Sequence, residues 1–216
     1  MNYIFYDFET TGIESNWDQI IQVGAVLTNS NFQEIDRFES RCCLRPGLIP
    51  YPKAILVNKS STKDLTNTKL SHFSLIELML AKFKSWGSAI YIGYNTISFD
   101  EEFLRKSLFK SLFDPYLTIN NGNKRTDLLS ILRANHAYYP DSIKIPINEK
   151  GKLVFKLDQV APLNGITDFS AHDAIGDSIA TIKLAELIGK KNPELWSASL
   201  LTTSREDADN IIKNNK

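Results

Sequence analysis

The sequence of 216 residues has little cysteine and no long apolar run. Its two cysteines, Cys42 and Cys43, are adjacent, so on a strand they would face opposite sides. That placement argues against a disulfide between them, and it matches no zinc-ligand spacing. Such sparse cysteine usage suits a reducing compartment, so we expect a cytoplasmic protein. No apolar stretch approaches the ~20 residues that a membrane-spanning helix needs, so we expect no membrane partner.

The chain also lacks net charge. Lys plus Arg and Asp plus Glu both number 25, which gives a formal net charge of zero. A nucleic-acid ligand would therefore need a local basic patch, because no global positive field is present to hold it. The start of the sequence has no basic segment followed by an apolar one, so no secretion signal is expected there. The hydrophobic content of 43% predicts an ordinary buried core.

The first residues carry the most informative pattern in the chain. Residues 3–8 are mostly aromatic or β-branched, which predicts a buried strand. Asp7 and Glu9 interrupt it, and because side chains alternate across a strand, both carboxylates point the same way. Two such charges repel each other, and a divalent cation is the simplest compensation. The alternative for so short a motif is a solvated pair at a strand end.

Hydrophobic periodicity and turn residues place the other elements. Strands are expected at residues 2–8, 19–28, 33–44, 89–93 and 153–155. Helices are expected at residues 54–58, 62–65, 72–86, 98–109, 127–138 and 157–163, and a last one follows the segment from residue 170 and ends at about 188. The first three strands are expected to pair antiparallel, and residues 120–125 are expected to form a polar loop. This order predicts an α/β fold, with a mixed sheet flanked by helices.

A second acidic segment lies near residue 100. Ser98 and Glu101, three residues apart, predict a capping box that starts a helix. Asp100 then lies in the first turn of that helix, where the helix dipole stabilises a carboxylate. Asp100 either serves the dipole alone or belongs to a functional site, and this segment by itself leaves both interpretations open.

A third segment, from residue 170, supplies a further carboxylate and a histidine. One face of the expected helix is uncharged apart from Asp177, so that carboxylate is predicted to point inward. Asp173 is the alternative for this role, although it is better placed to cap the helix. His172 precedes Asp177 by five residues, so we expect it in the loop before the helix. His172 could also be an ordinary polar residue.

Together these segments supply four carboxylates and one imidazole: Asp7, Glu9, Asp100, Asp177 and His172. Such a set suits a phosphodiester hydrolase whose carboxylates hold two Mg²⁺ or Mn²⁺ ions. His172 would accept the proton of the attacking water, because an imidazole with the usual pKa of ~6.5 can act as a base at neutral pH.

These motifs carry a resemblance to a known family. Asp7-x-Glu9, Phe99-Asp100 after Gly93-Tyr94-Asn95, and His172-x₄-Asp177 resemble the histidine variant of the DEDD exonuclease superfamily. That resemblance implies an RNase H-like fold and degradation of nucleic acids from the 3′ end. It also implies that the four carboxylates hold metal and that His172 is the general base.

Residues 2–196 further resemble bacterial exonuclease I. The matching segments include Asp114-Pro115-Tyr116, Asp127-Leu128-Leu129 and Asn164-Gly165-Ile166. This implies 3′-to-5′ degradation of single-stranded DNA to 5′-mononucleotides, by an exonuclease domain over residues 1–196. The positions implied near the DNA are Glu9 and Thr10 at the terminal nucleotide, and Arg105, Tyr116, Arg133 and Lys156 along the strand. Residues 197–216 are expected to be a polar helical tail or the truncated start of another domain.

Two other functions remain open at this point. One is an RNA-trimming or proofreading nuclease of the same superfamily, because the 2′-hydroxyl decides between RNA and DNA. The other is a non-catalytic nucleic-acid-binding domain. Trp17, Tyr94, Phe99 and Tyr116 are candidates for base stacking, although Tyr94 and Phe99 could equally be core residues.

Overall fold

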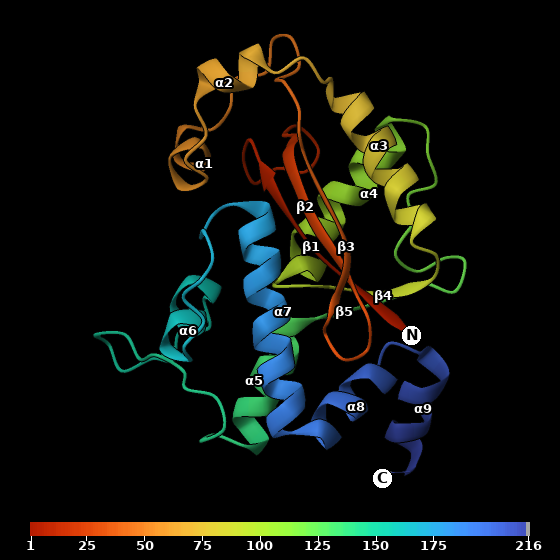
Figure 1. Cartoon of the computed structure of the whole chain (residues 1–216), viewed down its shortest axis with the longest axis vertical. Helices are drawn as coiled ribbons and strands as arrows, with labels where there is room; N and C mark the ends of the chain where they lie inside the picture. The colour runs from red at the N-terminus through yellow and green to blue at the C-terminus, as the bar shows by residue number, and fades with distance from the viewer. Residues whose placement is uncertain (215–216) are drawn as a thin grey trace.

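The computed structural model describes residues 1–214, which form a mixed five-stranded sheet with helices on both faces (Figure 1). The strands are β1 (Asn2–Thr10), β2 (Ile20–Thr28), β3 (Glu34–Arg41), β4 (Ala89–Gly93) and β5 (Lys124–Asp127), in the spatial order β3-β2-β1-β4-β5. β1, β2 and β3 pair antiparallel, whereas β1 with β4 and β4 with β5 pair parallel. The predicted α/β class, the mixed sheet and its antiparallel side are confirmed.

Nine α-helices and one 3₁₀ turn are found within residues 1–214. They are α1 (Pro52–Val57), α2 (Thr62–Asn67), α3 (His72–Ser85), η1 (Thr96–Ser98), α4 (Asp100–Lys110), α5 (Leu128–Tyr138), α6 (Leu157–Leu163), α7 (Ala174–Lys191), α8 (Pro193–Leu201) and α9 (Arg205–Asn214). Figure 1 shows α7 running along one side of the sheet, with α3 and α4 on the other. None of these helices is long and apolar enough to cross a membrane.

The alternation of side chains along β1 divides the core into two layers. Ile4, Tyr6 and Phe8 pack with residues of α3 and α4. Tyr3 and Phe5 point to the other face and pack with residues of α5, α7 and α8. Asp7 and Glu9 continue the row of Tyr3 and Phe5, so they lie on the face that α7 covers.

A glycine allows α7 to begin very close to the sheet. Gly24 on β2 pairs with Asp7 on β1. A β-carbon added at Gly24 would come within 2.3 Å of the backbone at Ala174 and Ile175, the first two residues of α7. Ser178 on the same helix also donates a hydrogen bond to the carbonyl of Gly24 at 3.1 Å. This close approach, which only glycine permits, brings the first turn of α7 beside Asp7.

Three local expectations are wrong. Ser98 belongs to η1, and α4 has Phe99 as its N-cap with no side-chain cap bond, so the capping box is absent. Residues 124–127 form β5 where the end of a polar loop was expected, because the edge of β4 offers them a parallel partner. The strand expected at 153–155 is reduced to one isolated bridge between Ile147 and Leu153.

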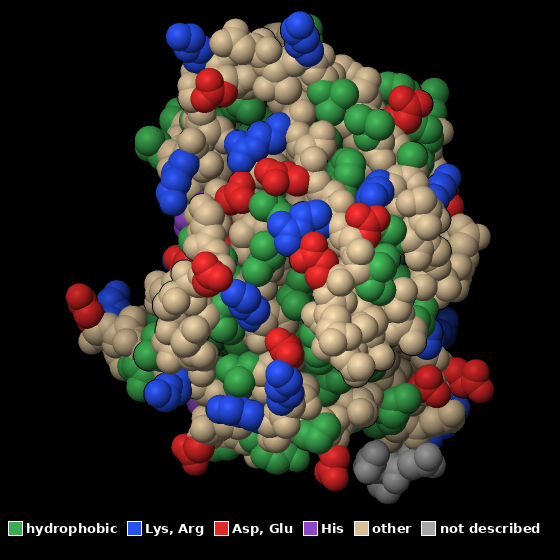
Figure 2. All heavy atoms as spheres, viewed as in Figure 1, with side chains coloured by type: hydrophobic (Ala, Val, Ile, Leu, Met, Phe, Trp, Pro, Cys, Tyr) green, Lys and Arg blue, Asp and Glu red, His purple; other side chains and the backbone are tan. Residues whose placement is uncertain are grey.

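Helix α8 packs against the same core. Trp196 of α8 is buried and stacks edge-on against Tyr3, with ring centroids 6.0 Å apart. The expected helical character of residues 197–214 is therefore observed in α8 and α9, while residues 215 and 216 lie outside the described residues. The division at residue 196 stays a prediction. On the face drawn in Figure 2, acidic and basic side chains are interspersed, in keeping with a net charge of zero.

Candidate active site

Three carboxylates from two elements converge at the end of β1. One oxygen from each of Asp7, Glu9 and Asp177 lies within 4.8 Å of the others. β1 supplies the first two from adjacent positions on one face, and the first turn of α7 supplies the third. None of the ion pairs among the described residues includes any of the three. We call Asp7, Glu9 and Asp177 the acidic cluster.

Burial and mutual repulsion make this cluster unfavourable for negative charge. Burial raises the pKa of Asp7 well above its usual value, and the neighbouring carboxylates of Asp100, Asp177 and Glu9 raise it further. Burial also raises the pKa of Glu9 to about 7, with Asp177 and Asp173 adding to the effect. The pKa of Asp177 is raised to about 6, again mainly by burial. A hard divalent cation would remove this penalty, so the residues present fit such a metal.

Asp100 lies next to the acidic cluster but is held differently. It is buried in the first turn of α4, and its Oδ1 accepts a hydrogen bond from the backbone N–H of Phe8 at 3.1 Å. The pairing of β1 with β4 ends at Phe5, which leaves room for this carboxylate beside β1. Burial raises the pKa of Asp100, and Glu9 is among the charges that raise it further. Asp100 is therefore close to the cluster, although its carboxylate is not one of the three that converge.

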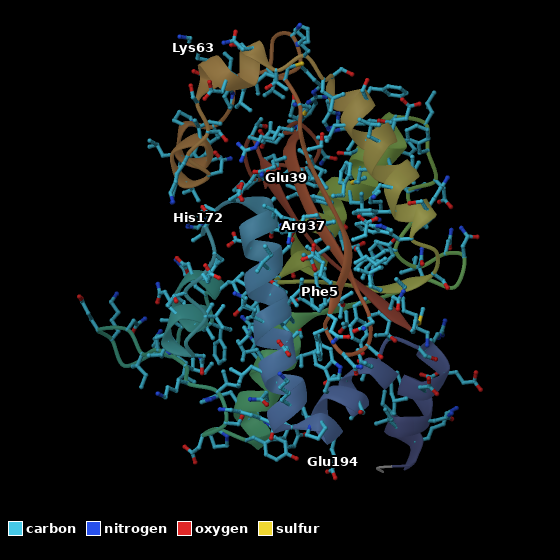
Figure 3. All side chains as sticks on the ribbon, viewed as in Figure 1. Phe5, Arg37, Glu39, Lys63, His172 and Glu194 are labelled. Atoms are coloured by element: carbon cyan, nitrogen blue, oxygen red, sulfur yellow. The ribbon has the colours of Figure 1, made fainter. Side chains whose placement is uncertain are left out.

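His172 lies in the loop directly before α7, as predicted. Figure 3 shows it near the start of that helix, and its backbone N–H donates to Asp177 Oδ2 at 3.2 Å. Its φ angle is 62°, in the left-handed region that side chains other than glycine rarely adopt. Asp173 is the N-cap residue of α7 but makes no side-chain cap bond there. Its carboxylate instead accepts hydrogen bonds from Gln22 at 2.7 Å and Arg41 at 2.9 Å.

Two grooves of different chemistry flank the acidic cluster. The first, of about 390 Å³, is mostly apolar and is lined by Phe8, Glu9, Thr10, Gly12, Ile13, Tyr51, Lys53, Ala54, Val57, Asn58 and Phe99. The second, of about 550 Å³, is more polar and is lined by Tyr94, Asn95, Leu129, Arg133, Leu153, Phe155, Lys156, Leu157, Asp158, His172 and Asp177. We call these the apolar groove and the polar groove. Because Glu9 lines one and Asp177 lines the other, the cluster lies between them.

The residues implied to lie near DNA divide into two sets. Thr10 lines the apolar groove, and its hydroxyl donates to the carbonyl of Gly12 at 2.6 Å. Arg133 and Lys156 line the polar groove. Arg105 and Tyr116 are exposed and line neither groove, so the structure does not bring them to the acidic cluster.

The aromatic candidates for base stacking are also separated. Tyr94 lines the polar groove, but its hydroxyl is bonded to the carbonyl of Phe155 at 2.6 Å and its ring packs on the core. Phe99 lines the apolar groove and packs on the core as well. Trp17 is 79% exposed, on the loop that follows β1.

One wall of the apolar groove was not predicted from the sequence. That wall comes from residues 51–58, in the irregular, proline-containing part of the chain. Asn58 is buried there, donates to the carbonyl of Thr10 at 3.2 Å, and lowers the pKa of Glu9 by hydrogen bonding. No periodicity or spacing in this segment pointed to the site. An asparagine in an otherwise apolar pocket is recognisable only once the fold is known.

Comparison with known proteins agrees with this geometry. The model of the RNase_T exonuclease family matches residues 4–185, a span that includes β1, Asp100, His172 and Asp177. The chain belongs to this exonuclease family. The RNase H-like sheet flanked by helices is shared with solved exonuclease I structures.

The relatives described next are longer than this chain. Exodeoxyribonuclease I of Buchnera aphidicola (subspecies Schizaphis graminum) is 34% identical over 198 residues, which cover 91% of this chain and 41% of that protein. The crystal structure of Escherichia coli exonuclease I with a dA16 oligonucleotide has a TM-score of 0.89 and 28% identity, covering 97% of this chain and 45% of that one. Exonuclease I of Methylocaldum szegediense has a TM-score of 0.89 and 29% identity, covering 98% and 45%. The chain thus spans less than half of the relatives it matches.

Proposed function

We propose that this chain is a divalent-metal-dependent 3′-to-5′ exonuclease that acts on single-stranded DNA and releases 5′-mononucleotides. The observation that carries the proposal is the acidic cluster, in which three unpaired carboxylates lie within 4.8 Å of one another between two grooves. Family membership supports the reaction class, and the solved relative that holds a dA16 oligonucleotide supports the substrate class.

Asp7, Glu9, Asp100 and Asp177 would hold two Mg²⁺ ions, with Mn²⁺ as a plausible substitute. The chemistry that such cations supply when bound is activation of a water molecule and stabilisation of the charge growing on the phosphoryl group. The acidic cluster supplies three of these ligands, and Asp100 keeps one carboxylate oxygen beyond its bond to Phe8.

His172 would accept the proton of the attacking water. It lines the polar groove together with Asp177, at the edge of the acidic cluster. Addition of the water oxygen to phosphorus breaks the bond to the 3′ oxygen of the strand. The released nucleotide then keeps the phosphate on its 5′ carbon, and the shortened strand keeps a 3′-hydroxyl.

The grooves suit the two sides of the scissile phosphate. The apolar groove, with Glu9 and Thr10 in its lining, would take the terminal nucleotide, because its apolar walls can cover a base and a sugar. Arg133 and Lys156 in the polar groove would bind backbone phosphates, Lys156 as a point charge without the paired contacts of an arginine. Arg105 and Tyr116 lie outside both grooves, so any contact with DNA would be made farther along the strand.

The substrate is tested by digestion of 5′-labelled single-stranded DNA, duplex DNA and RNA of one sequence with Mg²⁺, beside Asp7→Ala. We expect a ladder shortened from the 3′ end on single-stranded DNA, and no cleavage by the variant. Preference for RNA would favour the trimming nuclease, and preference for a frayed or mismatched duplex end would favour a proofreading role. Binding without cleavage would favour a non-catalytic domain.

The role of His172 is tested by His172→Gln, which removes the base and keeps a polar side chain. We expect the cleavage rate to fall about 10²–10⁴-fold, the usual range for loss of a general base. Mg²⁺ binding, measured by calorimetry, should be retained because the four carboxylates remain. A variant that cleaves at the rate of the unmodified protein would exclude His172 as the base.

A further inference from the structure

Another hollow lies away from the acidic cluster, where the segment after β3 meets the start of α3 and the end of α4. Its volume is about 310 Å³, and its lining includes Arg45, His72, Lys110, Ser71 and Ser111. Volumes of ~300–1,000 Å³ are typical of small-ligand sites. No residue of the two grooves at the acidic cluster lines it. We call this hollow the basic pocket.

The basic groups of this pocket repel one another. Burial lowers the pKa of His72 to about 4, and the charges of Arg45 and Lys110 lower it further. Burial also lowers the pKa of Lys110, with Arg45 and Lys106 adding to the effect. Within residues 1–214, none of the ion pairs includes Arg45, His72 or Lys110. Positive charge therefore gathers here, with the Asp18 carboxylate as the one opposing charge that acts on Lys110 among the causes of its shift.

Two nitrogens of the pocket are also left without hydrogen-bond partners. Arg45 Nε and His72 Nε2 are buried and have no partner among the described residues. Arg45 Nη2 donates to the carbonyl of Trp17 at 2.7 Å. Lys110 Nζ donates to the carbonyls of Asn16 at 2.7 Å and Ser15 at 3.2 Å. Carbonyl oxygens orient the two cations but do not cancel their charge. Buried polar groups in folded proteins are normally satisfied, so both nitrogens remain available to a hydrogen-bond partner.

The pocket is linked to the proposed active site through one loop and one helix. The carbonyls that Arg45 and Lys110 hold belong to the loop at residues 13–18, which also forms part of the apolar groove beside Glu9. Helix α4 begins at Asp100 and ends at Lys110, a rise of ~15 Å. The pocket is thus within reach of a polymer bound at the acidic cluster, but not of a single nucleotide bound there.

We propose that the basic pocket binds a phosphate oxyanion. A phosphate group carries full negative charge and several acceptor oxygens, which match a guanidinium, an ammonium and an imidazole that converge on one hollow. Two sources share this chemistry. One is a backbone phosphate of the nucleic-acid strand, several nucleotides from the scissile bond, and this source rests on the proposed exonuclease function. The other is a free phosphate ion.

The strand as source is tested by comparing short and long substrates. At ~3.4 Å per phosphate in a helical strand, about 3 nucleotides cannot span from the acidic cluster to the pocket, whereas about 12 can. Binding of both substrates is measured in EDTA. The double variant Arg45→Met/Lys110→Met should raise the Kd for the long strand by a factor about ten times larger than its factor for the trinucleotide. Its salt dependence should also fall by about 0.7 in log–log slope, because one phosphate is no longer neutralised. The matched control, Lys63→Met/Lys144→Met, removes two charges elsewhere and should change neither; Lys63 lies on α2 (Figure 3).

The free ion as source is tested on the unmodified protein, so this test does not depend on how the variants fold. Inorganic phosphate is titrated while the His72 imidazole resonance, assigned with His72→Gln, is followed by NMR. A saturable shift with phosphate supports binding of a free ion, and a shift with the long strand but not the trinucleotide supports binding of the strand. The proposal is overturned if neither moves the resonance and the long strand binds the double variant as tightly as the unmodified protein. Absence of trinucleotide cleavage by the unmodified protein would instead contradict the exonuclease proposal. The result of the phosphate titration does not depend on that outcome.

Discussion

Two buried acidic sites lie close together in this protein: the carboxylate of Glu101 and the acidic cluster. They differ in the groups that compensate their negative charge. Glu101 accepts hydrogen bonds from the hydroxyls of Tyr6 at 2.6 Å and Thr118 at 2.8 Å, and it pairs with Arg125 at 2.5 Å. No ion pair among the described residues includes a carboxylate of the acidic cluster. The two sites share the same segments of chain: Tyr6, a partner of Glu101, precedes Asp7, and Glu101 itself follows Asp100.

This difference separates structural from functional acid groups. A carboxylate whose partners are all supplied by the protein contributes to stability in the absence of any ligand. A group of carboxylates that the fold brings together and leaves unpaired lowers stability until a cation binds. Removing the charge of Glu101 should therefore lower the stability of the protein, whereas removing a charge from the acidic cluster should lower its activity.

The largest expected effect is on catalysis. Asp177→Asn keeps the shape of the side chain but removes one charge from the acidic cluster. We expect the cleavage rate to fall by at least about 10³-fold, since loss of metal-based stabilisation is worth several kcal/mol. Thermal unfolding in EDTA should show no loss of stability, because the substitution also relieves repulsion. If Asp177→Asn lost stability but kept its activity, Asp177 would be a structural residue and the account would be contradicted.

Glu101 should show the opposite result. Glu101→Ala leaves the buried hydroxyl of Tyr6 without its acceptor and Arg125 without its partner, so we expect a loss of about 2–4 kcal/mol in the free energy of unfolding. Glu102→Ala is the matched control, because Glu102 pairs with Arg105 on the exposed side of the same helix. Its effect should stay within about 0.5 kcal/mol in urea titrations. Equal losses in both variants would contradict the structural role of Glu101.

Metal should stabilise only a protein with an intact acidic cluster. At a Mg²⁺ concentration 100 times the Kd, the free energy of unfolding of the unmodified protein should rise by about 2.7 kcal/mol. Asp7→Asn should show much less of this gain, whereas Glu102→Ala should keep it. The comparison is made by urea unfolding with EDTA and with Mg²⁺ at fixed ionic strength. A gain of the same size in Asp7→Asn would place the metal elsewhere.

The stability of the metal-free protein should also depend on pH. The pKa of Glu9 is raised from 4.5 to about 7 in the folded state, so the folded state binds more protons than the unfolded state between these values. The stability associated with Glu9 is therefore fully present below pH 4.5 and is lost as the pH rises through about 7. Urea titrations in EDTA should show this decline, and Glu9→Gln should flatten it. A decline of unchanged slope in the variant would assign it to other groups.

Much of the site could be predicted because its geometry follows from local periodicity. The alternation of a strand places Asp7 and Glu9 on one face, and the period of a helix turns Asp177 toward the sheet. The five-residue separation placed His172 in the loop before α7. Spacing predicts the direction of each side chain within its own element. That the two elements meet is a separate assumption, and the structure supports it for Asp7, Glu9 and Asp177.

The features that were missed depend on contacts between distant segments. The pattern of Ser98 and Glu101 resembles a capping box, yet Glu101 is taken by Tyr6, Thr118 and Arg125, which no local pattern reveals. β5 is polar, and it forms a strand only because the edge of β4 pairs with it. The wall of the apolar groove at residues 51–58 is set by the path of the chain between β3 and α3 rather than by composition.

The most direct test of the account is to locate the metal. Crystals of the unmodified protein are soaked in Mn²⁺, and anomalous difference density is computed from data collected near the manganese edge. The account predicts a peak between the carboxylates of Asp7, Glu9 and Asp177, which disappears in Asp7→Asn. An acidic cluster that remains empty at saturating Mn²⁺, with its three carboxylates still within contact of one another, would contradict it.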